Sequence, residues 1–414
     1  MLAQTLMTGR AGLLSPPESP VGRDSSPAAS SSSPARQSDS AAARGQSSTS
    51  LPFDLIDNRI FIDVRLNNRG PYRFIFDTGA VAVVRPEVAR ELGLSIEGVT
   101  RGEGGVGEKT VERGSTRIAS IEVGDVRLAN QEFGVISFAD DKAVFGSHKF
   151  DGIIGFPIFQ RFVVEIDYQR QRLTFTPPAG FAYRGKGTIV PVELDGHLPQ
   201  VAGEVDGLRG TFVIDTGARS SLILFGPFVE ANDLREKYHA TFEGVTGWGI
   251  GGPVRSQLAR VSSLKLGAVE ARDVVARLSL QKSGALTDKR KAGLVGYDVL
   301  KQFTLTVDYS RRQLIFEKNN AYGQRDAYDR SGMWFGQAGD YFEIIDVMAG
   351  GPAAEAGLRA GDRIIAIDGQ RAAALDLPAT RLKLRSERAQ TRVRLSVEAK
   401  GARREVVLVL RDLV

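Results

Sequence analysis

Two aspartates are the strongest candidates for chemistry in this chain, because each follows the same apolar run. "FIFDTGA" occupies residues 74–80, and "FVIDTGA" occupies residues 212–218. Each copy predicts a buried strand that ends at a carboxylate, followed by a glycine suited to a sharp turn. A single aspartate of this kind could be structural, but two in matching contexts suggest a pair.

A pair of facing carboxyl groups can hydrolyse a peptide bond. Two such groups cannot both ionise cheaply at short range, so we expect Asp77 and Asp215 to share a proton and to titrate together. One member would act as general base toward a water molecule while the other protonates the substrate carbonyl. This chemistry requires neither a metal nor a covalent intermediate.

The residues that follow each aspartate fit this role. Thr78 and Thr216 can bridge the pair through their hydroxyl groups, and Gly79 and Gly217 leave room for backbone amides to approach the carboxylates. Such catalysis depends on rigid geometry that is set before the substrate binds.

Composition excludes several other classes of function. The chain has no cysteine, so disulfides, thiolate metal sites and a cysteine nucleophile are absent. Its three histidines, His148, His197 and His239, do not have the helical spacing of a metal motif. A net charge of +5 over 414 residues is too small to indicate nucleic-acid binding. We therefore expect no metal and no cofactor. We also expect no transmembrane segment, since no run of about 18 apolar residues occurs.

The elements that must position the aspartates are mainly β-strands. After a Ser-, Pro- and Ala-rich segment over residues 1–50, which we expect to be a disordered tail or leader, short alternating apolar runs are separated by turn residues. Helix signals are few and begin at Arg85, Phe156 and Gly226.

An internal repeat organises this β-rich region. "GFPIFQRFVVEIDYQRQRLTF" from residue 155 aligns without gaps on "GYDVLKQFTLTVDYSRRQLIF" from residue 296. The offset between these segments, 141, is close to the offset of 138 between the two aspartates. We therefore predict two lobes, residues 51–182 and 183–318. The aspartates repeated within this segment, Asp167 and Asp308, are expected to form turns.

Residues 51–318 resemble the aspartic peptidase superfamily, which includes the retroviral and pepsin-like proteases, in a bilobal single-chain form. The resemblance rests on the two Asp-Thr-Gly-Ala motifs and on "IIG" at 153–155 and "LVG" at 294–296. It implies two β-barrel lobes related by a pseudo-twofold axis, with the "IIG" and "LVG" segments supporting the aspartate loops. Because Ala80 and Ala218 lack the hydroxyl found in pepsins, we expect a dyad of higher pKa, active at weakly acidic to neutral pH.

Two glycine-rich loops lie 25 to 35 residues after the aspartate motifs. "RGEGGVGEKT" from residue 101 and "GWGIGG" from residue 247 resemble nucleotide-binding loops only superficially, since no suitable helix follows either. In the resembled family a flap closes over the substrate at this position. By position, Gly104, Gly105 and Trp248 are flap candidates, although a simple hairpin tip would have the same composition.

Residues 321–414 resemble a small α+β PDZ domain of the kind fused to bacterial envelope proteases. "GGPAAEAGLRAGDRIIAIDGQ" from residue 350 carries the resemblance, and a hairpin turn is expected at Lys400 and Gly401. The resemblance implies a peptide-binding loop that would capture a chain terminus. Its residues would be Gly332, Met333, Trp334 and Phe335. The basic stretch at 380–395 is expected to be a solvated face.

The sequence thus predicts an aspartic endopeptidase whose PDZ domain recruits protein or peptide substrates. Each lobe supplies one aspartate, so a monomer suffices for the site. Two alternatives remain: an inert protease fold that serves as a peptide-binding scaffold, and a dormant enzyme whose cleft is covered by its tail or PDZ domain. The fusion pattern favours the periplasm or cell envelope over the cytoplasm.

Overall fold

The computed structural model describes residues 48–138 and 140–414. The disordered tail expected over residues 1–50 therefore lies outside the described residues up to position 47. Strand β1 (Thr49–Pro52) begins within that expected tail and pairs with β11 (Arg172–Thr176). Among the described residues, no helix is both long and apolar enough to cross a bilayer.

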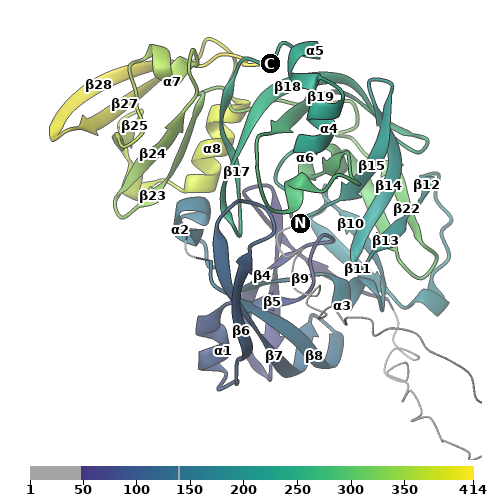
Figure 1. Cartoon of the computed structure of the whole chain (residues 1–414). Helices are drawn as coiled ribbons and strands as arrows, with labels where there is room; N and C mark the ends of the chain where they lie inside the picture. Colours follow the sequence, from purple (N-terminus) through teal and green to yellow (C-terminus); the bar gives the residue numbers. More distant parts are fainter. Residues whose placement is uncertain (1–47, 139) are drawn as a thin grey trace, which may run out of the picture.

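The first lobe is built on an eight-stranded sheet in the order β2-β3-β4-β9-β5-β8-β7-β6 (Figure 1). Its strands are β2 (Asp54–Ile56), β3 (Arg59–Leu66), β4 (Arg69–Phe76), β5 (Val83–Val84), β6 (Glu97–Glu103), β7 (Thr110–Val123), β8 (Val126–Ile136) and β9 (Gly152–Ile154). Three short helices accompany them: α1 (Pro86–Glu91), α2 (Asp141–Phe145) and α3 (Phe156–Phe159).

The second lobe repeats this topology strand for strand, in the order β13-β14-β15-β20-β16-β19-β18-β17. Its strands are β13 (Glu193–Asp195), β14 (Leu198–Val205), β15 (Leu208–Ile214), β16 (Leu222–Leu224), β17 (Glu243–Gly249), β18 (Gly252–Leu266), β19 (Val269–Ser279) and β20 (Gly293–Val295). Its helices are α4 (Gly226–Ala231), α5 (Leu234–Lys237) and α6 (Tyr297–Leu300). The helices expected near Arg85, Phe156 and Gly226 are thereby confirmed.

A six-stranded sheet joins the two lobes, in the order β1-β11-β10-β21-β22-β12. Its remaining strands are β10 (Val163–Asp167), β12 (Thr188–Pro191), β21 (Phe303–Asp308) and β22 (Gln313–Lys318). Strands β10 and β21 come from the repeated segments and pair antiparallel at the centre, with Val164 opposite Val307. The two lobes therefore meet through copies of the same segment.

The repeated aspartates of this sheet form turns, as expected. A carboxylate oxygen of Asp167 accepts a hydrogen bond from the backbone of Arg170 at 2.9 Å, and Asp308 accepts one from Arg311 at 3.1 Å. Both bonds span three residues, which is ordinary turn chemistry for Asp.

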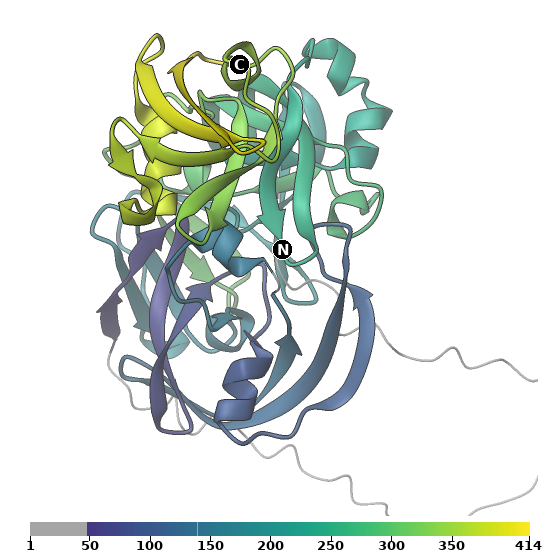
Figure 2. The ribbon, with the colours of Figure 1, turned by 90° about the vertical axis from the view of Figure 1, so that its left-hand side faces the viewer.

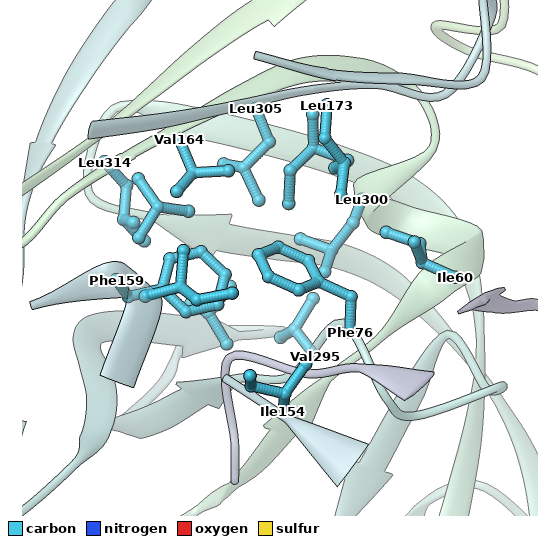
Figure 3. Close-up of a cluster of buried hydrophobic side chains, with 14 of the residues drawn as sticks. Ile60, Phe76, Ile154, Phe159, Val164, Leu173, Val295, Leu300, Leu305 and Leu314 are labelled. Atoms are coloured by element: carbon cyan, nitrogen blue, oxygen red, sulfur yellow. The ribbon is translucent and has the colours of Figure 1, made fainter. Parts of the chain in front are cut away.

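A continuous apolar core connects the shared sheet to the strands that end at the dyad aspartates (Figure 3). Phe76 precedes Asp77 and is fully buried against Phe159, with the two ring centroids 4.8 Å apart. Each large side chain buried in this way contributes about 1.5–3 kcal/mol. The strand ends are therefore held by a core common to both lobes. Other residues of this core labelled in the figure are Ile60, Ile154, Val164, Leu173, Val295, Leu300, Leu305 and Leu314.

The C-terminal region has its own sheet and core. Its strands are β23 (Met333–Ala338), β24 (Tyr341–Val347), β25 (Arg363–Ile367), β26 (Gln370–Arg371), β27 (Arg392–Ala399) and β28 (Ala402–Val409), with helices α7 (Pro352–Glu355) and α8 (Leu377–Ser386). The hairpin turn expected at Lys400 and Gly401 is confirmed, since both have positive φ between paired β27 and β28. Strand β23 lies at the edge of this sheet. The region packs beside β17 and against α2 (Figures 1 and 2).

Candidate active site

The two aspartate motifs meet at the centre of the molecule. Asp77 directly follows β4 and Asp215 directly follows β15, and both side chains are buried. The backbone N–H of Asp77 donates to Ile154 O at 3.0 Å, and that of Asp215 donates to Val295 O at 2.9 Å. The acceptors belong to the "IIG" and "LVG" segments, so each aspartate is held by the strand that runs beside it.

Each carboxylate is also bound by the glycine two residues later. Gly79 N donates to Asp77 Oδ1 at 2.6 Å, and Gly217 N donates to Asp215 Oδ1 at 2.9 Å. A Cβ atom at Gly217 would lie 2.3 Å from Asp77 Oδ2, a distance that no side chain tolerates. Asp77 therefore reaches across to the loop of the other lobe, and glycine is required there for steric reasons.

The two carboxyl groups interact, and the pKa of Asp77 is raised to about 7. Burial is the largest cause, because a desolvated carboxylate is disfavoured. The charge of Asp215 and a side-chain hydrogen bond with Asp215 raise it further, while the Gly79 amide opposes them. At weakly acidic pH the site therefore retains a proton on Asp77.

Thr78 and Thr216 join the two loops by exchanging hydrogen bonds. Thr78 N donates to Thr216 Oγ1 at 3.0 Å, and Thr216 N donates to Thr78 Oγ1, also at 3.0 Å. Each hydroxyl then donates onward to the opposite strand, to Ile214 O at 2.8 Å and to Phe76 O at 3.1 Å. All four residues are buried, so these bonds fix the two aspartate loops relative to one another.

Sequence reasoning missed a second symmetric pair, Arg59 and His197. These residues are 138 positions apart, the same offset as the two aspartates. Arg59 Nε donates to Gly217 O at 3.0 Å, and the His197 ring forms a hydrogen bond with the backbone of Gly79. Each lobe thus places a basic side chain on the aspartate loop of the other. The shared repeat offset was the signal that could have revealed them.

His197 is neutral near pH 7. Burial is the largest cause, lowering its pKa to about 4. Its counterpart Arg59 is a cation beside the dyad at that pH, whereas His197 is uncharged. The two halves of the site are symmetric in position but not in charge.

The glycine-rich loops form hairpin tips that meet each other. The β6–β7 tip contains Gly104 and Gly105, and the β17–β18 tip follows Trp248. Gly251 N donates to Val106 O at 2.9 Å, and Lys109 N donates to Gly251 O at 2.9 Å. A third bond, from Ala285 N to Gly105 O at 2.9 Å, ties the first tip to the second lobe.

The residues that anchor these tips are Val106 and Ile250, which sequence reasoning also missed. Val106 packs into an apolar cluster of the second lobe that includes Val213, and Ile250 packs into one of the first lobe that includes Ile75. Val213 and Ile75 lie in the strands that end at the dyad. Each hairpin tip therefore inserts one side chain into the opposite lobe, close to the aspartates. The pattern Gly-apolar-Gly, present in both loops, was the available signal.

The expected peptide-binding loop of the C-terminal domain is turned toward the protease lobes. Met333, Trp334 and Phe335 are all buried. The Trp334 ring stacks with Trp248 at 6.4 Å between centroids, and two guanidinium groups, of Arg219 and Arg381, lie over it. Trp334 and the flap candidate Trp248 are thus brought together across a domain boundary.

The edge of β23 is already partly paired. Arg381, on α8, donates to Phe335 O and to two carbonyls of α2, those of Ala143 (3.0 Å) and Val144 (2.8 Å). Gly336 lies against Ala143 as well, since a Cβ there would be 2.7 Å from its carbonyl oxygen. The expectation that the basic stretch at 380–395 is a solvated face is therefore wrong for Arg381, which is 5% exposed. A contact between distant parts of the chain buries it.

One buried carboxylate gathers arginines from all three domains. Asp57 forms ion pairs with Arg59 at 2.5 Å, with Arg219 at 2.9 Å and, more distantly, with Arg381 at 3.9 Å. Burial, the largest effect, raises the pKa of Asp57, but the charges of the three arginines together bring it below its ordinary value. Arg219 lies four residues after Asp215, so this cluster connects the C-terminal domain to a dyad loop.

The described residues include no group of three or more His, Cys, Asp or Glu side chains arranged to hold a metal ion. The polar groups at the centre of the site are the two carboxyls and the backbone amides that donate to them. A pair of carboxyl groups can bind and activate a water molecule.

Two protein families match parts of this chain. A family described as aspartyl protease matches residues 62–158 and 201–299, and a PDZ domain family matches residues 343–398. The solved structure of the aspartic proteinase from Irpex lacteus aligns with a TM-score of 0.46 and 12% sequence identity, over 67% of this chain and 99% of that one. A search of curated proteins found no match.

Proposed function

Because the chain is a two-lobed member of the aspartyl protease family with a C-terminal PDZ domain, we propose that it is an aspartic endopeptidase. Asp77 and Asp215 are the catalytic residues, and their supports are Thr78, Gly79, Thr216 and Gly217. The observation that carries the proposal is that the two carboxyls are buried together and interact: burial first, and then the charge and hydrogen bond of Asp215, raise the pKa of Asp77, which is about 7.

The reaction uses one water molecule and the proton held by the pair. Asp215 takes a proton from the water as its oxygen attacks the substrate carbonyl carbon, and Asp77 gives its proton to the carbonyl oxygen. The resulting gem-diol collapses when Asp215 passes its proton to the amide nitrogen and the C–N bond breaks. A diol proton then returns to Asp77. Both carboxyls end in their starting states.

Substrate access requires the two hairpin tips to separate. The tips are joined by hydrogen bonds at Val106, Lys109 and Gly251, and Val106 and Ile250 are inserted in opposite lobes. A polypeptide therefore reaches the dyad only after these contacts open, and their reformation would exclude water during the reaction. Gly104, Gly105 and Trp248 belong to this moving part.

The PDZ domain, in this proposal, recruits or positions protein substrates. A peptide strand that adds to β23 must compete with Arg381 for Phe335 O and with α2 for the neighbouring edge. Since α2 belongs to the first protease lobe, occupation of the groove is coupled to the contact between the domains. One chain supplies both aspartates, so a monomer suffices.

The test is cleavage of an unbiased peptide mixture between pH 3 and pH 8. We expect the wild-type chain to cleave at weakly acidic to neutral pH, and Asp77→Asn and Asp215→Asn each to lower the rate by roughly 100- to 10,000-fold. Asp167→Asn is the matched control, because Asp167 is also a repeated, buried aspartate but makes a turn. Cleavage that survives both dyad substitutions would refute the proposal. Peptide binding without any cleavage would favour the scaffold alternative.

A further inference from the structure

A cavity of about 530 Å³ lies where the two protease lobes meet the PDZ domain. The first lobe contributes the β2–β3 turn, the second lobe contributes β19 and α6, and the PDZ domain contributes the start of β23 and one face of α8. The cavity is therefore continuous with the groove between β23 and α8. Its wall opposite the PDZ domain belongs to the protease.

The lining is cationic. Seven arginine and lysine side chains face four aspartates. The cations are Arg219, Arg277, Lys301, Arg325, Arg330, Arg381 and Arg385, and the aspartates are Asp57, Asp298, Asp329 and Asp376.

Most of these cations have a carboxylate partner. Arg219 pairs with Asp57 at 2.9 Å, Lys301 and Arg385 each pair with Asp298 at 2.8 Å, and Arg330 pairs with Asp412 at 2.6 Å. These pairs hold the cavity walls in place. The carboxylates also neutralise most of the positive charge of these four cations.

Arg277, on β19, is the exception. Its side chain is buried, being 7% exposed, and its guanidinium lies over the Tyr328 ring at 5.7 Å. It makes no ion pair with a carboxylate anywhere in residues 48–138 or 140–414. Burial, the largest cause, lowers its pKa to about 10, so it remains charged at neutral pH. The Asp298 carboxylate attracts it only from beyond ion-pair distance. A buried charge without a direct ion pair is costly, which makes this arginine unusual as a purely structural residue.

The position of Arg277 connects the cavity to the flap of the second lobe. A Cβ atom at Gly247 would lie 3.4 Å from Arg277 Nη1, and Gly247 precedes Trp248 in β17. The same cavity is lined by Met333 and Trp334 of β23. A ligand that reaches Arg277 from the groove thus comes close to the hairpin that covers the dyad.

We propose that this cavity binds a carboxylate of a peptide held in the PDZ groove, and that Arg277 of the second protease lobe is the residue that recognises it. The inference rests on the peptide-binding part of the proposed function. A guanidinium binds a carboxylate through two parallel hydrogen bonds, which is strong and directional. The carboxylate comes from an acidic side chain near the end of the peptide or from its terminus. The protease lobe, and not the PDZ domain alone, thereby sets the choice of partner.

The test measures binding separately from cleavage. The full-length chain with Asp77→Asn is titrated into fluorescein-labelled decapeptides in fluorescence anisotropy. One peptide has aspartates in its last four residues and a free terminus, a second has asparagines instead, and a third keeps the aspartates but has an amidated terminus. We expect at least one of the two changed peptides to bind about tenfold or more weakly than the first. Which one weakens identifies the source of the carboxylate.

Substitutions at Arg277 then assign the preference. Arg277→Gln should abolish the discrimination between peptides, whereas Arg277→Lys should keep part of it. Arg272→Gln is the matched control, because Arg272 lies on the same strand but is exposed and paired with Glu270. Arg277→Gln should also unfold at the same temperature as the parent chain or higher, since an unpaired buried charge is removed. A structural role predicts a lower unfolding temperature.

Besides a lower unfolding temperature of the Arg277→Gln protein, two binding results would overturn the proposal. One is a parent chain that binds all three peptides equally, and the other is Arg277→Gln protein that still discriminates like the parent. Because the measurement uses the Asp77→Asn chain, neither result depends on proteolysis. A protein that discriminates in binding but whose wild type cleaves nothing would support this inference while refuting the proposed catalysis.

Discussion

Thr78 and Thr216 are 138 residues apart in sequence, yet each donates its backbone N–H to the other's hydroxyl at the same distance of 3.0 Å. Their hydroxyls donate in turn to Ile214 and Phe76, the residues that precede the two aspartates. The relative position of the two dyad carboxyls is therefore set by four hydrogen bonds between the lobes.

Thr78→Val should destabilise the protein and lower its activity. The substitution keeps the shape of the side chain but leaves Thr216 N and Ile214 O buried without partners, at roughly 1–3 kcal/mol for each group. We expect the free energy of unfolding in urea to fall by about 2–4 kcal/mol. Thr78→Ser, which retains the hydroxyl, is the control and should remain close to wild type. Equal stability of the valine and serine variants would contradict this account.

Asp77 should make the wild-type protein less stable as the pH rises from about 4 to about 7. Its folded-state pKa is about 7 and its ordinary value is 3.8, so in this window the folded state binds a proton that the unfolded state has released. The stabilising contribution is fully present below about pH 4 and is lost once the pH passes 7, a change of up to ~4 kcal/mol.

Thermal unfolding of wild type and Asp77→Asn over this range checks the prediction. The asparagine cannot titrate, so the difference in unfolding temperature should shift in favour of the variant with increasing pH. Parallel pH profiles for the two proteins would show that the Asp77 carboxyl is not perturbed in the folded state.

Gly107→Ala should prevent the two hairpin tips from joining. Gly107 has a φ of +103°, and a Cβ atom there would lie 2.3 Å from the carbonyl carbon of Gly251. We expect faster hydrogen exchange at the Lys109 and Gly251 amides, which donate in this contact. Gly98→Ala is the control, because Gly98 is in the same hairpin with a φ of +59° but has no atom within 4 Å of its added Cβ. Exchange rates that rise equally in both variants would point to general loosening of the hairpin.

Asp57→Asn should weaken the contact between the PDZ domain and the protease lobes. Two buried guanidinium groups, of Arg59 and Arg381, and the partly buried one of Arg219 would lose their shared carboxylate. Breaking such a buried pair costs about 3–5 kcal/mol. We expect the free energy of unfolding in urea to fall by this amount. Backbone amide hydrogens of α2 and β23 should also exchange faster. Because the pKa of Asp57 is lowered in the folded state, the wild-type protein should also lose stability as the pH falls below about 4 and Asp57 becomes protonated.

Asp63→Asn is the matched control for Asp57. Asp63 also pairs with an arginine, Arg73 at 2.8 Å, but its side chain is 59% exposed. Exposed pairs contribute at most about 1 kcal/mol. Similar losses for the two substitutions would mean that burial of the Asp57 cluster has no special importance.

Some parts of the site could be predicted from the sequence because they are encoded locally. The apolar strand that ends at Asp77, and its copy at Asp215, are visible as hydrophobic runs followed by Thr-Gly. The internal sequence repeat also implied two lobes. Arg59 and His197 are separated by the same offset of 138 residues as the two aspartates. Because one is arginine and the other histidine, a search for identical repeated residues does not find this pair.

The sequence by itself thus determined the mainly β fold, the duplicated strands and the pair of aspartates, since short-range hydrophobic periodicity and a repeated motif specify these features. Only the tertiary structure decided that Val106 and Ile250 insert into opposite lobes and that Trp334 is enclosed between Trp248 and two arginines. It also decided that Arg277 is buried without an ion-pair partner in the part of the chain that the structure describes. The physical reason is that the burial and pairing of a charged or aromatic side chain depend on what packs against it from distant parts of the chain. In the sequence, Arg381 could not be told from a solvated arginine, because its partners on α2 and at Asp57 lie more than 200 residues away.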